Sequence, residues 1–390
     1  MKLLIYSHFF APSVGGVETI ILSLARGLAG LRDSNGAPQF EITLVTQTPA
    51  GNCEDSAFPF RVTRKPGFRH LWRLIRESDA VHVAGPALAP LFLAALSRKP
   101  FLVEHHGFQT ICPNGQLLIK PSGIPCPGHF RAGHHLECLR CNSAEGWRAS
   151  QKLWLLTFVR RLLCARAAAN IAPTQWLGTL LALPRGVTVY HGVEGKESSL
   201  RAAVDSCKPT IVFLGRLVTT KGVGVLFEAA RSLHQQGRRF ELVVIGDGPE
   251  RAALEQFARA SQLKEQVQFL GQIGGAQLES TLAKASTVVV PSLGGEVFGL
   301  VVAENMLRGL AVVVSDLGSL TEVLGDSGLR FRTGNAADLS SVLARLLDDP
   351  SLAATLGHRA RQRALLLYSV DHMIESHALL YSQFCPLKNR

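Results

Sequence analysis

The sequence has 390 residues, of which 47% are hydrophobic and 18% are charged, and its formal net charge is +11. This composition is ordinary for a globular α/β protein, and the length predicts two domains instead of one hydrophobic core. No apolar run is long enough for a membrane-spanning helix. The excess of basic residues predicts anionic partners, such as nucleotides, phosphates, acidic lipid headgroups or nucleic acid.

The chain starts with a short apolar segment, Lys2–Ser7, that we expect to be a strand. The segment is too short for a signal peptide and lacks a small-residue cleavage site, which predicts a cytoplasmic protein. Gly15 and Gly16 then precede an amphipathic helix from Glu18 to Gly30. A glycine turn between a strand and a helix binds phosphate in many nucleotide-binding folds, but such a pair is also common where a helix packs closely.

Basic residues crowd one short stretch of the first half: Arg61, Arg64, Lys65, Arg69, Arg73 and Arg76. A solvated face is the commonest explanation of such a run. Because no nucleic-acid-binding motif accompanies the run, we rank a membrane surface above nucleic acid as its partner.

Three further strands are expected at Glu41–Thr46, Val81–Val83 and Phe101–Glu104, with helical stretches between them. This alternation predicts a parallel sheet. His105 and His106 directly follow the third strand, at the end where ligands bind in open α/β sheets. A single buried histidine is nevertheless more often structural than catalytic.

A cysteine-rich segment follows at residues 112–141, and its four thiols are those of Cys112, Cys126, Cys138 and Cys141. Four thiolates can close a tetrahedral zinc site, and the final Cys-x-x-Cys pair supplies two ligands from one turn. The spacing of the first two cysteines matches no standard zinc module. Free thiols without metal are therefore an equal alternative, whereas disulfides are disfavoured in a cytoplasmic protein.

Residues Trp147 to Arg166 predict a basic helix with a broad apolar face. Such a helix can lie on a membrane surface, although packing against a sheet is more common. Residues 170–174 predict a strand followed by a turn, and residues 187–194 predict the strand that closes the first domain. The polar, non-periodic residues 195–208 then predict an interdomain linker.

The second half opens with a predicted strand, Thr210–Leu214, followed at its carboxyl end by Gly215, Arg216 and Lys221. A guanidinium group can bind two phosphate oxygens at once, and a lysine adds a point charge. Single basic residues in loops usually lie on the surface without a binding role. The position of this pair directly after a strand favours phosphate binding instead. Later strands are expected at Leu242–Ile245, Val267–Leu270, Thr287–Val290, Ala311–Ser315 and Leu329–Phe331.

The strand Thr287–Val290 leads into two glycines and then into a helix expected from Phe298 to about Arg308. Glu296 precedes this helix and Glu304 lies inside it. The free N–H groups and partial positive charge of a helix N-terminus suit a phosphate. Two carboxylates beside a phosphate site suit a sugar nucleotide, because each can bind hydroxyl groups of one of its two sugars. A capped helix with two solvated glutamates is the alternative.

This segment resembles the Glu-x7-Glu motif of retaining GT-B glycosyltransferases, above all glycosyltransferase family 4. The resemblance implies that Glu296 faces the donor sugar and that Glu304 binds the ribose. The sequence around Arg216 and Lys221 resembles the family's Gly-Arg-Leu and Lys-Gly motif, which implies that both bind the donor diphosphate. The His-Gly pair at His106 resembles the family's active-site histidine, with His105 as the reserve.

The resemblance implies further contacts to the donor through backbone groups. For the diphosphate they are Gly15, Gly16, Phe298, Gly299 and Leu300, and for the base they are Gly271, Gln272 and Ile273. No metal would be required for catalysis, and the sequence has no Asp-x-Asp motif, so a structural zinc ion at the cysteines is the one cofactor expected. The chain departs from the family pattern in having Thr174 for Ser, and His191 and Glu194 for Asn and Asp.

The fold implied is α/β GT-B, with two Rossmann-like domains whose parallel sheets face each other across a cleft. We expect an acceptor-side domain at 1–195, a donor domain at 208–367 and a helix at 368–390 that crosses back to the first domain. The implied activity is transfer of a sugar, with retention, from a nucleoside-diphosphate sugar to a glycan, lipid-linked or small-molecule acceptor. It would take place in the cytoplasm, with the protein bound peripherally to the inner face of the membrane. A sugar-nucleotide 2-epimerase and a non-catalytic sugar-nucleotide-binding protein are the alternatives, and turnover without an acceptor would identify the epimerase.

Overall fold

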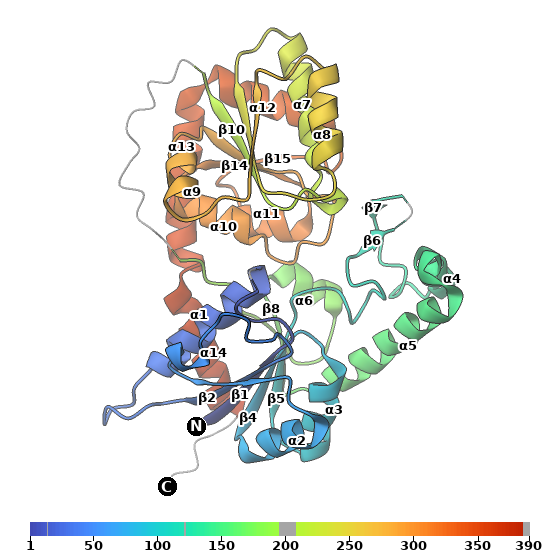
Figure 1. Cartoon of the computed structure of the whole chain (residues 1–390), viewed down its shortest axis with the longest axis vertical. Helices are drawn as coiled ribbons and strands as arrows, with labels where there is room; N and C mark the ends of the chain where they lie inside the picture. The colour runs from blue at the N-terminus through green and yellow to red at the C-terminus, as the bar shows by residue number, and fades with distance from the viewer. Residues whose placement is uncertain (14, 121, 195–207, 385–390) are drawn as a thin grey trace. The chain divides into compact units, whose positions relative to one another are not determined.

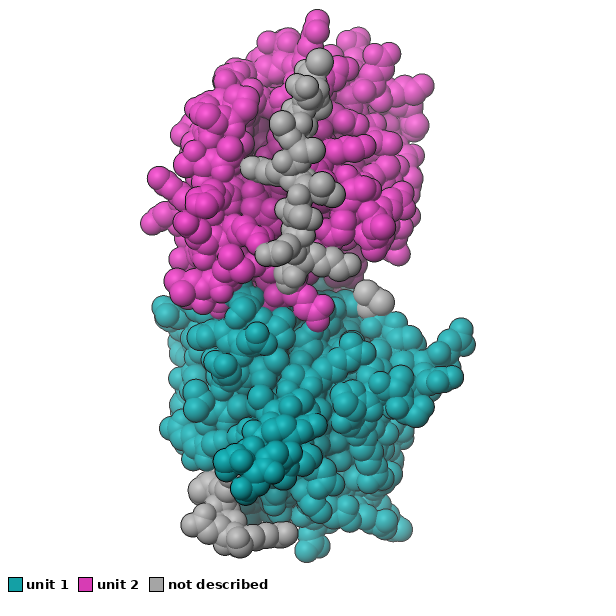
Figure 2. Space-filling model, turned by 90° about the vertical axis from the view of Figure 1, so that its left-hand side faces the viewer, with its two compact units in different colours: residues 1–117, 126–192, 368–390 teal, residues 118–125, 193–367 magenta. Residues whose placement is uncertain are grey.

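The computed structural model describes residues 1–13, 15–120, 122–194 and 208–384. The chain divides into two compact units, which Figure 2 shows in different colours. The first unit comprises residues 1–117, 126–192 and 368–390, and the second comprises residues 118–125 and 193–367. The predicted linker lies outside the described residues, except for Lys208.

A parallel sheet with the strand order β3-β2-β1-β4-β5-β8-β9 forms the centre of the first unit (Figure 1). Strands β4 and β5 are buried along their whole length, which explains why their sequences run apolar instead of alternating. The strands are β1 (Lys2–Ser7), β2 (Glu41–Thr46), β3 (Arg61–Arg64), β4 (Ala80–Ala84), β5 (Phe101–Glu104), β8 (Ala169–Ala172) and β9 (Gly186–Thr188).

Helices of the first unit come from both ends of the chain, since the C-terminal helix α14 packs beside α1 (Figure 1). The contact is close: a Cβ atom on Gly27 of α1 would lie 2.0 Å from Ile374 Cδ1 of α14. The helices are α1 (Gly16–Gly30), α2 (Phe68–Glu77), α3 (Leu88–Ser97), α4 (His135–Cys141), α5 (Trp147–Cys164), α6 (Gln175–Leu181) and α14 (Val370–Phe384).

The second unit has its own parallel sheet, with the strand order β12-β11-β10-β13-β14-β15. Its strands are β10 (Thr210–Leu214), β11 (Glu241–Ile245), β12 (Val267–Gly271), β13 (Thr287–Val290), β14 (Ala311–Ser315) and β15 (Leu329–Phe331). Its helices are α7 (Val223–Gln235), α8 (Arg251–Ala260), α9 (Gly275–Leu282), α10 (Leu300–Leu307), α11 (Gly318–Leu324), α12 (Ala336–Asp348) and α13 (Pro350–Leu367). A short antiparallel hairpin, β6 (Leu118–Ile119) with β7 (Ile124–Pro125), also clusters with this unit.

Both parallel sheets change their winding direction once. In the first sheet the change falls between β1 and β4, and in the second it falls between β10 and β13. Ligands of doubly wound sheets bind at such a point, outside the carboxyl ends of the strands. In the second unit the loops after β10 and β13 carry Arg216, Lys221 and Glu296, so the topology brings the predicted donor residues to one crevice.

Most predicted strands lie within about a residue of the expected bounds, but the strand expected at 187–194 ends earlier, since β9 stops at Thr188, and some elements were not predicted. The basic stretch contains β3, which pairs with β2 at the edge of the sheet, and α2, which buries Leu71, Leu74 and Ile75 on one side. The helix expected from Phe298 begins at Leu300, since Gly299 at its N-cap has a φ of +91°, which is outside the helical region.

One glycine contact of the second unit gives a testable prediction about stability. Gly222 has a φ of +63°, and a Cβ atom there would lie 2.0 Å from the Pro291 carbonyl oxygen. We expect Gly222→Ala to lower the free energy of unfolding of the second unit by about 2–5 kcal/mol, from left-handed strain plus overpacking. Gly224→Ala, two residues on in α7 with no neighbour within 4 Å, should instead stabilise it by about 0.5–1 kcal/mol.

The measurement is urea unfolding followed by hydrogen exchange of β10 and β13 peptides. The tryptophans, Trp72, Trp147, Trp154 and Trp176, all lie in the first unit, so their fluorescence serves as the internal reference. Equal unfolding midpoints for the two alanine variants would contradict the close approach of Gly222 to Pro291.

Candidate functional site

The loop after β10 presents two basic side chains of different exposure. Arg216 is exposed, and its guanidinium makes no hydrogen bond or ion pair with any described residue. Lys221 lies at the end of a short 3-10 turn, Thr219–Lys221, and its side chain is 27% exposed. The turn is fixed to the neighbouring loop, because Leu293 N donates to Thr220 O at 2.8 Å. Arg216 is thus free for a ligand, whereas Lys221 is held in place.

Glu296 in the loop after β13 is the partner of Lys221. Lys221 Nζ lies 2.5 Å from Glu296 Oε1, and Ser292 Oγ donates to the same oxygen at 2.9 Å. The backbone of this loop is fixed as well, since Ser319 Oγ donates to Glu296 O at 2.9 Å and Ser315 Oγ donates to Ser292 O at 2.6 Å. The predicted diphosphate-binding lysine and the predicted sugar-facing carboxylate therefore meet at one point.

Helix α10 begins directly beyond this point. Phe298 is buried, and a Cβ atom on Gly299 would lie 2.5 Å from Leu320 Cδ2, so only glycine fits at the N-cap. The first turn, starting at Leu300, leaves the free N–H groups that suit a phosphate. Glu304 lies in the second turn, and burial raises its pKa, as does nearby Glu279, while Arg308 lowers it.

The predicted base-binding segment follows β12. Gly271 has a φ of +67° and its carbonyl accepts from Gly246 N at 2.7 Å, which ties this strand end to the loop after β11. Gln272 is exposed and Ile273 is half-buried. A cavity of about 490 Å³ in the second unit lies instead between α7 and α8, lined by Phe227, Leu254 and Phe257 among others, and includes none of the predicted donor residues.

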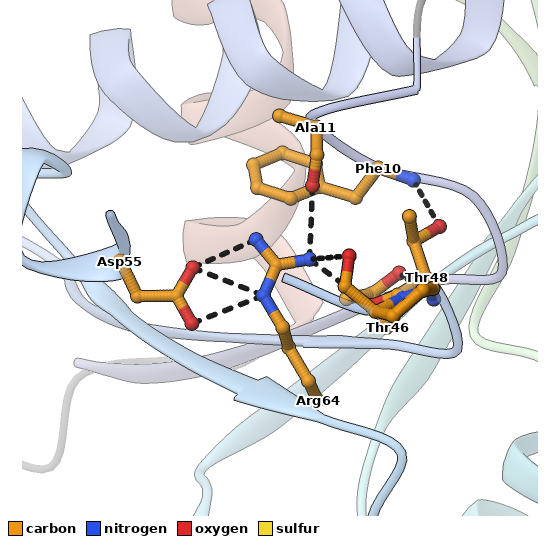
Figure 3. Close-up of polar contacts among 7 residues, drawn as sticks. Phe10, Ala11, Thr46, Thr48, Asp55 and Arg64 are labelled. Atoms are coloured by element: carbon orange, nitrogen blue, oxygen red, sulfur yellow. Dashed lines mark hydrogen bonds and ion pairs between the residues drawn. The ribbon is translucent and has the colours of Figure 1, made fainter. Parts of the chain in front are cut away.

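In the first unit, Arg64 holds the loop after β1 (Figure 3). Its guanidinium pairs with Asp55 at 2.7 Å and donates to the carbonyls of Ala11 at 2.9 Å and Thr48 at 3.0 Å. The Arg64 side chain is only 10% exposed. The solvated basic face expected for this stretch is wrong for Arg64, because Asp55 and the carbonyls of Ala11, Thr48 and Pro49 all accept from its guanidinium.

The Gly15–Gly16 pair lies at the start of α1, as expected for a phosphate site, but an acidic side chain covers it. A Cβ atom on Gly15 would lie 2.5 Å from Glu18 Oε2, and Ser13 Oγ donates to Glu18 Oε1 at 3.0 Å. A carboxylate in the first turn already compensates the helix dipole. Phosphate binding at this loop stays a prediction, and it would require Glu18 to move aside.

The end of β5 contains a buried cluster of one carboxylate and several imidazoles. Glu104 Oε2 lies 3.1 Å from His82 Nε2, 3.6 Å from His106 Nε2 and 3.8 Å from His377 Nε2, and Glu104 Oε1 lies 3.5 Å from His191 Nδ1. The rings of His106 and His191 stack at 5.3 Å. His106 therefore belongs to a group that spans β4, β5, the loop after β9 and α14.

Electrostatics favour the ionised form of this carboxylate and the neutral form of His191 and His377. Burial raises the pKa of Glu104, but the charge and contact of His106 and the contact of His82 outweigh it and hold that pKa well below its usual value. Burial lowers the pKa of His191 to about 3 and also lowers the pKa of His377. A buried carboxylate is stable only where neighbouring groups compensate its charge, so the groups around Glu104 are not interchangeable with apolar residues.

His105 does not share this environment, although it was the reserve for the catalytic role. Its Nε2 donates to Asn170 Oδ1 at 3.0 Å, and burial lowers its pKa to about 4. The amide of Asn170 is itself oriented, because its Nδ2 donates to the carbonyls of Cys164 and Pro184. His105 is a core residue that fixes β5 against β8.

Several members of the Glu104 cluster were not predicted as site residues. Glu104 was identified only as a strand end, and His82 and His377 were not singled out because each lies within an apolar pattern. One signal was available: His191 replaces the asparagine expected from the family pattern. That substitution adds a third histidine beyond the carboxyl ends of β5 and β9, which lie at the same edge of one parallel sheet.

The four cysteines of residues 112–141 lie near one another as free thiols. Cys112 Sγ donates to Asn114 Oδ1 at 3.0 Å, and Asn114 Nδ2 donates to Cys141 Sγ at 3.5 Å. Burial raises the pKa of Cys138 to about 12, with Cys112, Cys126 and Cys141 adding to the rise. Among the described residues, however, the groups with three metal-ligating atoms within 4.8 Å of one another both centre on Glu104. Zinc binding by the cysteines stays a prediction.

Comparison with known proteins identifies the family of the second unit. Residues 197–363 match the family model described as "Glycosyl transferases group 1". A phosphatidyl-myo-inositol mannosyltransferase of Mycolicibacterium smegmatis is 36% identical over 157 residues, which is 40% of each chain. A 2-deoxystreptamine glucosyltransferase of Streptomyces kanamyceticus is 29% identical over 216 residues, which is 50% of this chain and 56% of the relative. The chain thus spans about half the length of these curated relatives.

Solved structures extend the similarity to the fold of the whole chain. The sucrose-phosphate synthase from Thermosynechococcus elongatus has a TM-score of 0.73 at 19% identity, covering 98% of both chains. The Anabaena protein HepE, solved with UDP and glucose, has a TM-score of 0.70 at 19% identity, covering 98% of this chain and all of its own. The predicted GT-B fold with two Rossmann-like domains is confirmed. Within the described part of the chain, no helix is long and apolar enough to cross a membrane.

The contact between Lys221 and Glu296 gives a prediction that needs no ligand. We expect a double-mutant cycle with Lys221→Met and Glu296→Gln to show a coupling energy of about 1–3 kcal/mol in the stability of the second unit, because each single change leaves the other charge half-buried without its partner. The same urea and hydrogen-exchange measurement applies. Additive effects of the two substitutions would show that the pair is not formed in solution.

Proposed function

Since its second unit belongs to the family of glycosyl transferases group 1, we propose that this chain transfers a sugar from a nucleoside-diphosphate sugar to an acceptor. One observation carries the proposal: Arg216, Lys221, Glu296 and the N-terminus of α10 gather at the point where the second sheet changes its winding direction. This place combines positive charge for a diphosphate with a carboxylate for a sugar. The UDP and glucose bound by the structural neighbour HepE support a nucleotide sugar as the donor.

The chemistry follows from the charges at this place. Arg216 can bind two phosphate oxygens, and the N–H groups of the first turn of α10 can bind further ones. These groups stabilise the negative charge that develops on the departing diphosphate, which is usually the largest contribution to such catalysis. Lys221 joins them once a phosphate competes with Glu296 for its ammonium group.

That competition gives Glu296 its role. Without donor, its Oε1 is held by Lys221 and by the Ser292 hydroxyl. When the phosphate takes over Lys221, the carboxylate becomes available to the positive charge that grows on the transferring sugar. Glu304, half-buried one turn along α10, is proposed to bind the ribose. Residues 271–273 are proposed to bind the base, and His106 of the first unit is proposed to contact the reacting sugar. Retention of configuration is part of the same proposal.

The direct test is product analysis. Donor candidates are first screened by thermal shift, and the stabilising donor is then incubated with free and with lipid-linked acceptors before mass spectrometry. A glycosylated acceptor supports the proposal. Conversion of the donor into an isomeric sugar nucleotide without acceptor would identify an epimerase, and binding without turnover would identify a non-catalytic protein.

The two glutamates should differ in kinetics with the identified donor. We expect Glu296→Gln to lower kcat by about 10²–10³-fold with little change in KM, because its charge acts on the transition state. Glu304→Gln should raise the KM for the donor by about tenfold or more at similar kcat, because a hydrogen bond to ribose is equal in both states. Glu265→Gln, an exposed substitution elsewhere in the unit, is the control. The reverse pattern would show that the sugar and ribose positions have been exchanged.

We further propose that the first unit binds an anionic membrane surface through α5. Leu155, Phe158, Val159 and Leu162 recur at helical spacing and are all exposed, with Leu155 and Leu162 at 56% and 59%. The helix contains no acidic residue, and Arg148 and Lys152 are exposed beside this stripe. An apolar stripe bordered by basic residues is the pattern of helices that lie on membranes.

The membrane proposal is tested by sedimentation with vesicles of anionic and of neutral lipids. We expect binding to the anionic vesicles that weakens as salt is added, and a loss of at least about tenfold in affinity for Leu155→Ser with Leu162→Ser, since each leucine loses its apolar burial. Leu366→Ser, at a 74% exposed position in α13, is the matched control. Equal binding of all three proteins would exclude α5 as the contact.

A further inference from the structure

The Glu104 cluster contains an inner group of three side chains that the proposed transfer reaction does not use. His82 comes from β4, Glu104 from the end of β5 and His377 from the middle of α14, and all three side chains are completely buried. Their ligating atoms all lie within 4.8 Å of one another. The group therefore connects two central strands to a helix near the other end of the sequence.

The hydrogen bond of His377 fixes the direction of its lone pair. His377 Nδ1 lies 2.9 Å from the carbonyl oxygen of Met373, which can only accept, so Nδ1 must carry the hydrogen. In the neutral imidazole, Nε2 is then an acceptor, and it faces Glu104 Oε2 at 3.8 Å with no hydrogen-bond partner among the described residues. Two acceptors that face each other in a dry core repel unless a cation lies between them.

The outer nitrogen of His82 is held in a similar way. His82 Nδ1 lies 2.9 Å from the hydroxyl of Tyr381, one turn further along α14 than His377. In both histidines an outer nitrogen is held by a neighbouring group while Nε2 faces the same carboxylate oxygen. For His82 that contact is a hydrogen bond of 3.1 Å to Glu104 Oε2, so a metal ion would displace the hydrogen on Nε2, and the Tyr381 hydroxyl can then accept from Nδ1. Metal-binding histidines have this arrangement, because the outer hydrogen bond fixes the tautomer and orients the ring.

The distances favour a metal ion over a proton as the cation. A protonated imidazole beside a carboxylate closes to about 2.7–2.9 Å, whereas the His377 contact is 3.8 Å. Ligands 2.0–2.1 Å from a tetrahedral ion are separated by about 3.3–3.4 Å. The separations of Glu104 Oε2 from His82 Nε2 and His377 Nε2, 3.1 and 3.8 Å, lie on either side of this value.

We propose that His82, Glu104 and His377 bind one divalent transition-metal ion of the zinc class within the first unit. Two imidazoles and one carboxylate are a ligand set that zinc accepts, and the fourth position would go to water or to His106 Nε2, which lies 3.6 Å from the same oxygen. The ion compensates the buried carboxylate and fastens α14 to β4 and β5. With water in the fourth position, this inference is independent of the proposed transferase activity, since it then uses neither the donor, nor the second unit, nor His106.

The test is metal analysis of the full chain after expression with zinc and gel filtration. We expect about one tightly bound equivalent that His377→Gln loses and that His372→Gln, an exposed histidine on the same helix, retains. Tyr381→Phe keeps the packing of the ring and should weaken metal affinity by about 10–100-fold in a chelator competition, which keeps the test valid if His377→Gln fails to fold. Chelation should lower the melting temperature of the native chain but not that of His377→Gln.

Cobalt substitution separates this site from the cysteines. Cobalt bound by His82, Glu104 and His377 gives visible ligand-field bands without a thiolate-to-cobalt charge-transfer band, and these bands should persist in Cys138→Ser. A second equivalent that carries the charge-transfer band and disappears in Cys138→Ser would belong to the cysteines. A chain that binds no metal, or whose only metal is lost with Cys138→Ser or retained in His377→Gln, would overturn the proposal.

Discussion

Parallel pairing of strands is the constraint on which this structure depends. Because every crossover returns to the same edge, the carboxyl ends of all strands in a sheet lie together, and residues far apart in sequence meet there. Lys221 and Glu296, which are 75 positions apart in the sequence, are in contact at the second sheet. Glu104 contacts His191 and His377 at the first sheet. The chemistry of each unit is therefore decided by which side chains follow its central strands, while the helices mainly provide the apolar cover that keeps the sheet intact.

The two carboxylates at these strand ends have opposite environments. Glu296 is partly exposed and has a lysine and a hydroxyl as partners, and the proposed function requires it to exchange them for a ligand. Glu104 is completely buried, and its pKa is held well below the usual value against the effect of burial. A carboxylate that must react with a changing ligand needs the first environment. One that must stay charged and fixed needs the second, together with a permanent cation.

The fold was largely predictable from sequence because buried parallel strands have an unmistakable apolar pattern, as in Thr287–Val290 and Ala311–Ser315. Because Arg216, Lys221 and Glu296 directly follow predicted strands in the sequence, their location at strand ends could be predicted as well. Pairing could not be predicted: nothing in the sequence states that Lys221 contacts Glu296, or that Arg64 turns inward to Asp55 instead of facing solvent. Likewise His105 and His106 are adjacent and chemically identical, and only the strand's alternation sends one to Asn170 and the other toward Glu104.

The C-terminal helix connects these findings. Helix α14 leaves the second unit after α13 and returns to the first, where Tyr381 and His377 contact His82 and the Glu104 cluster. Apolar packing alone, such as that of Ile374 on Gly27, would hold the helix without specifying its rotation about its own axis. Polar groups with fixed geometry specify that rotation, because a turn of the helix would separate both side chains from the strand ends at once. The buried cluster thus sets the position of α14 and, through Glu104, that of His106, so the geometry of the candidate active-site histidine depends on residues at the opposite end of the chain.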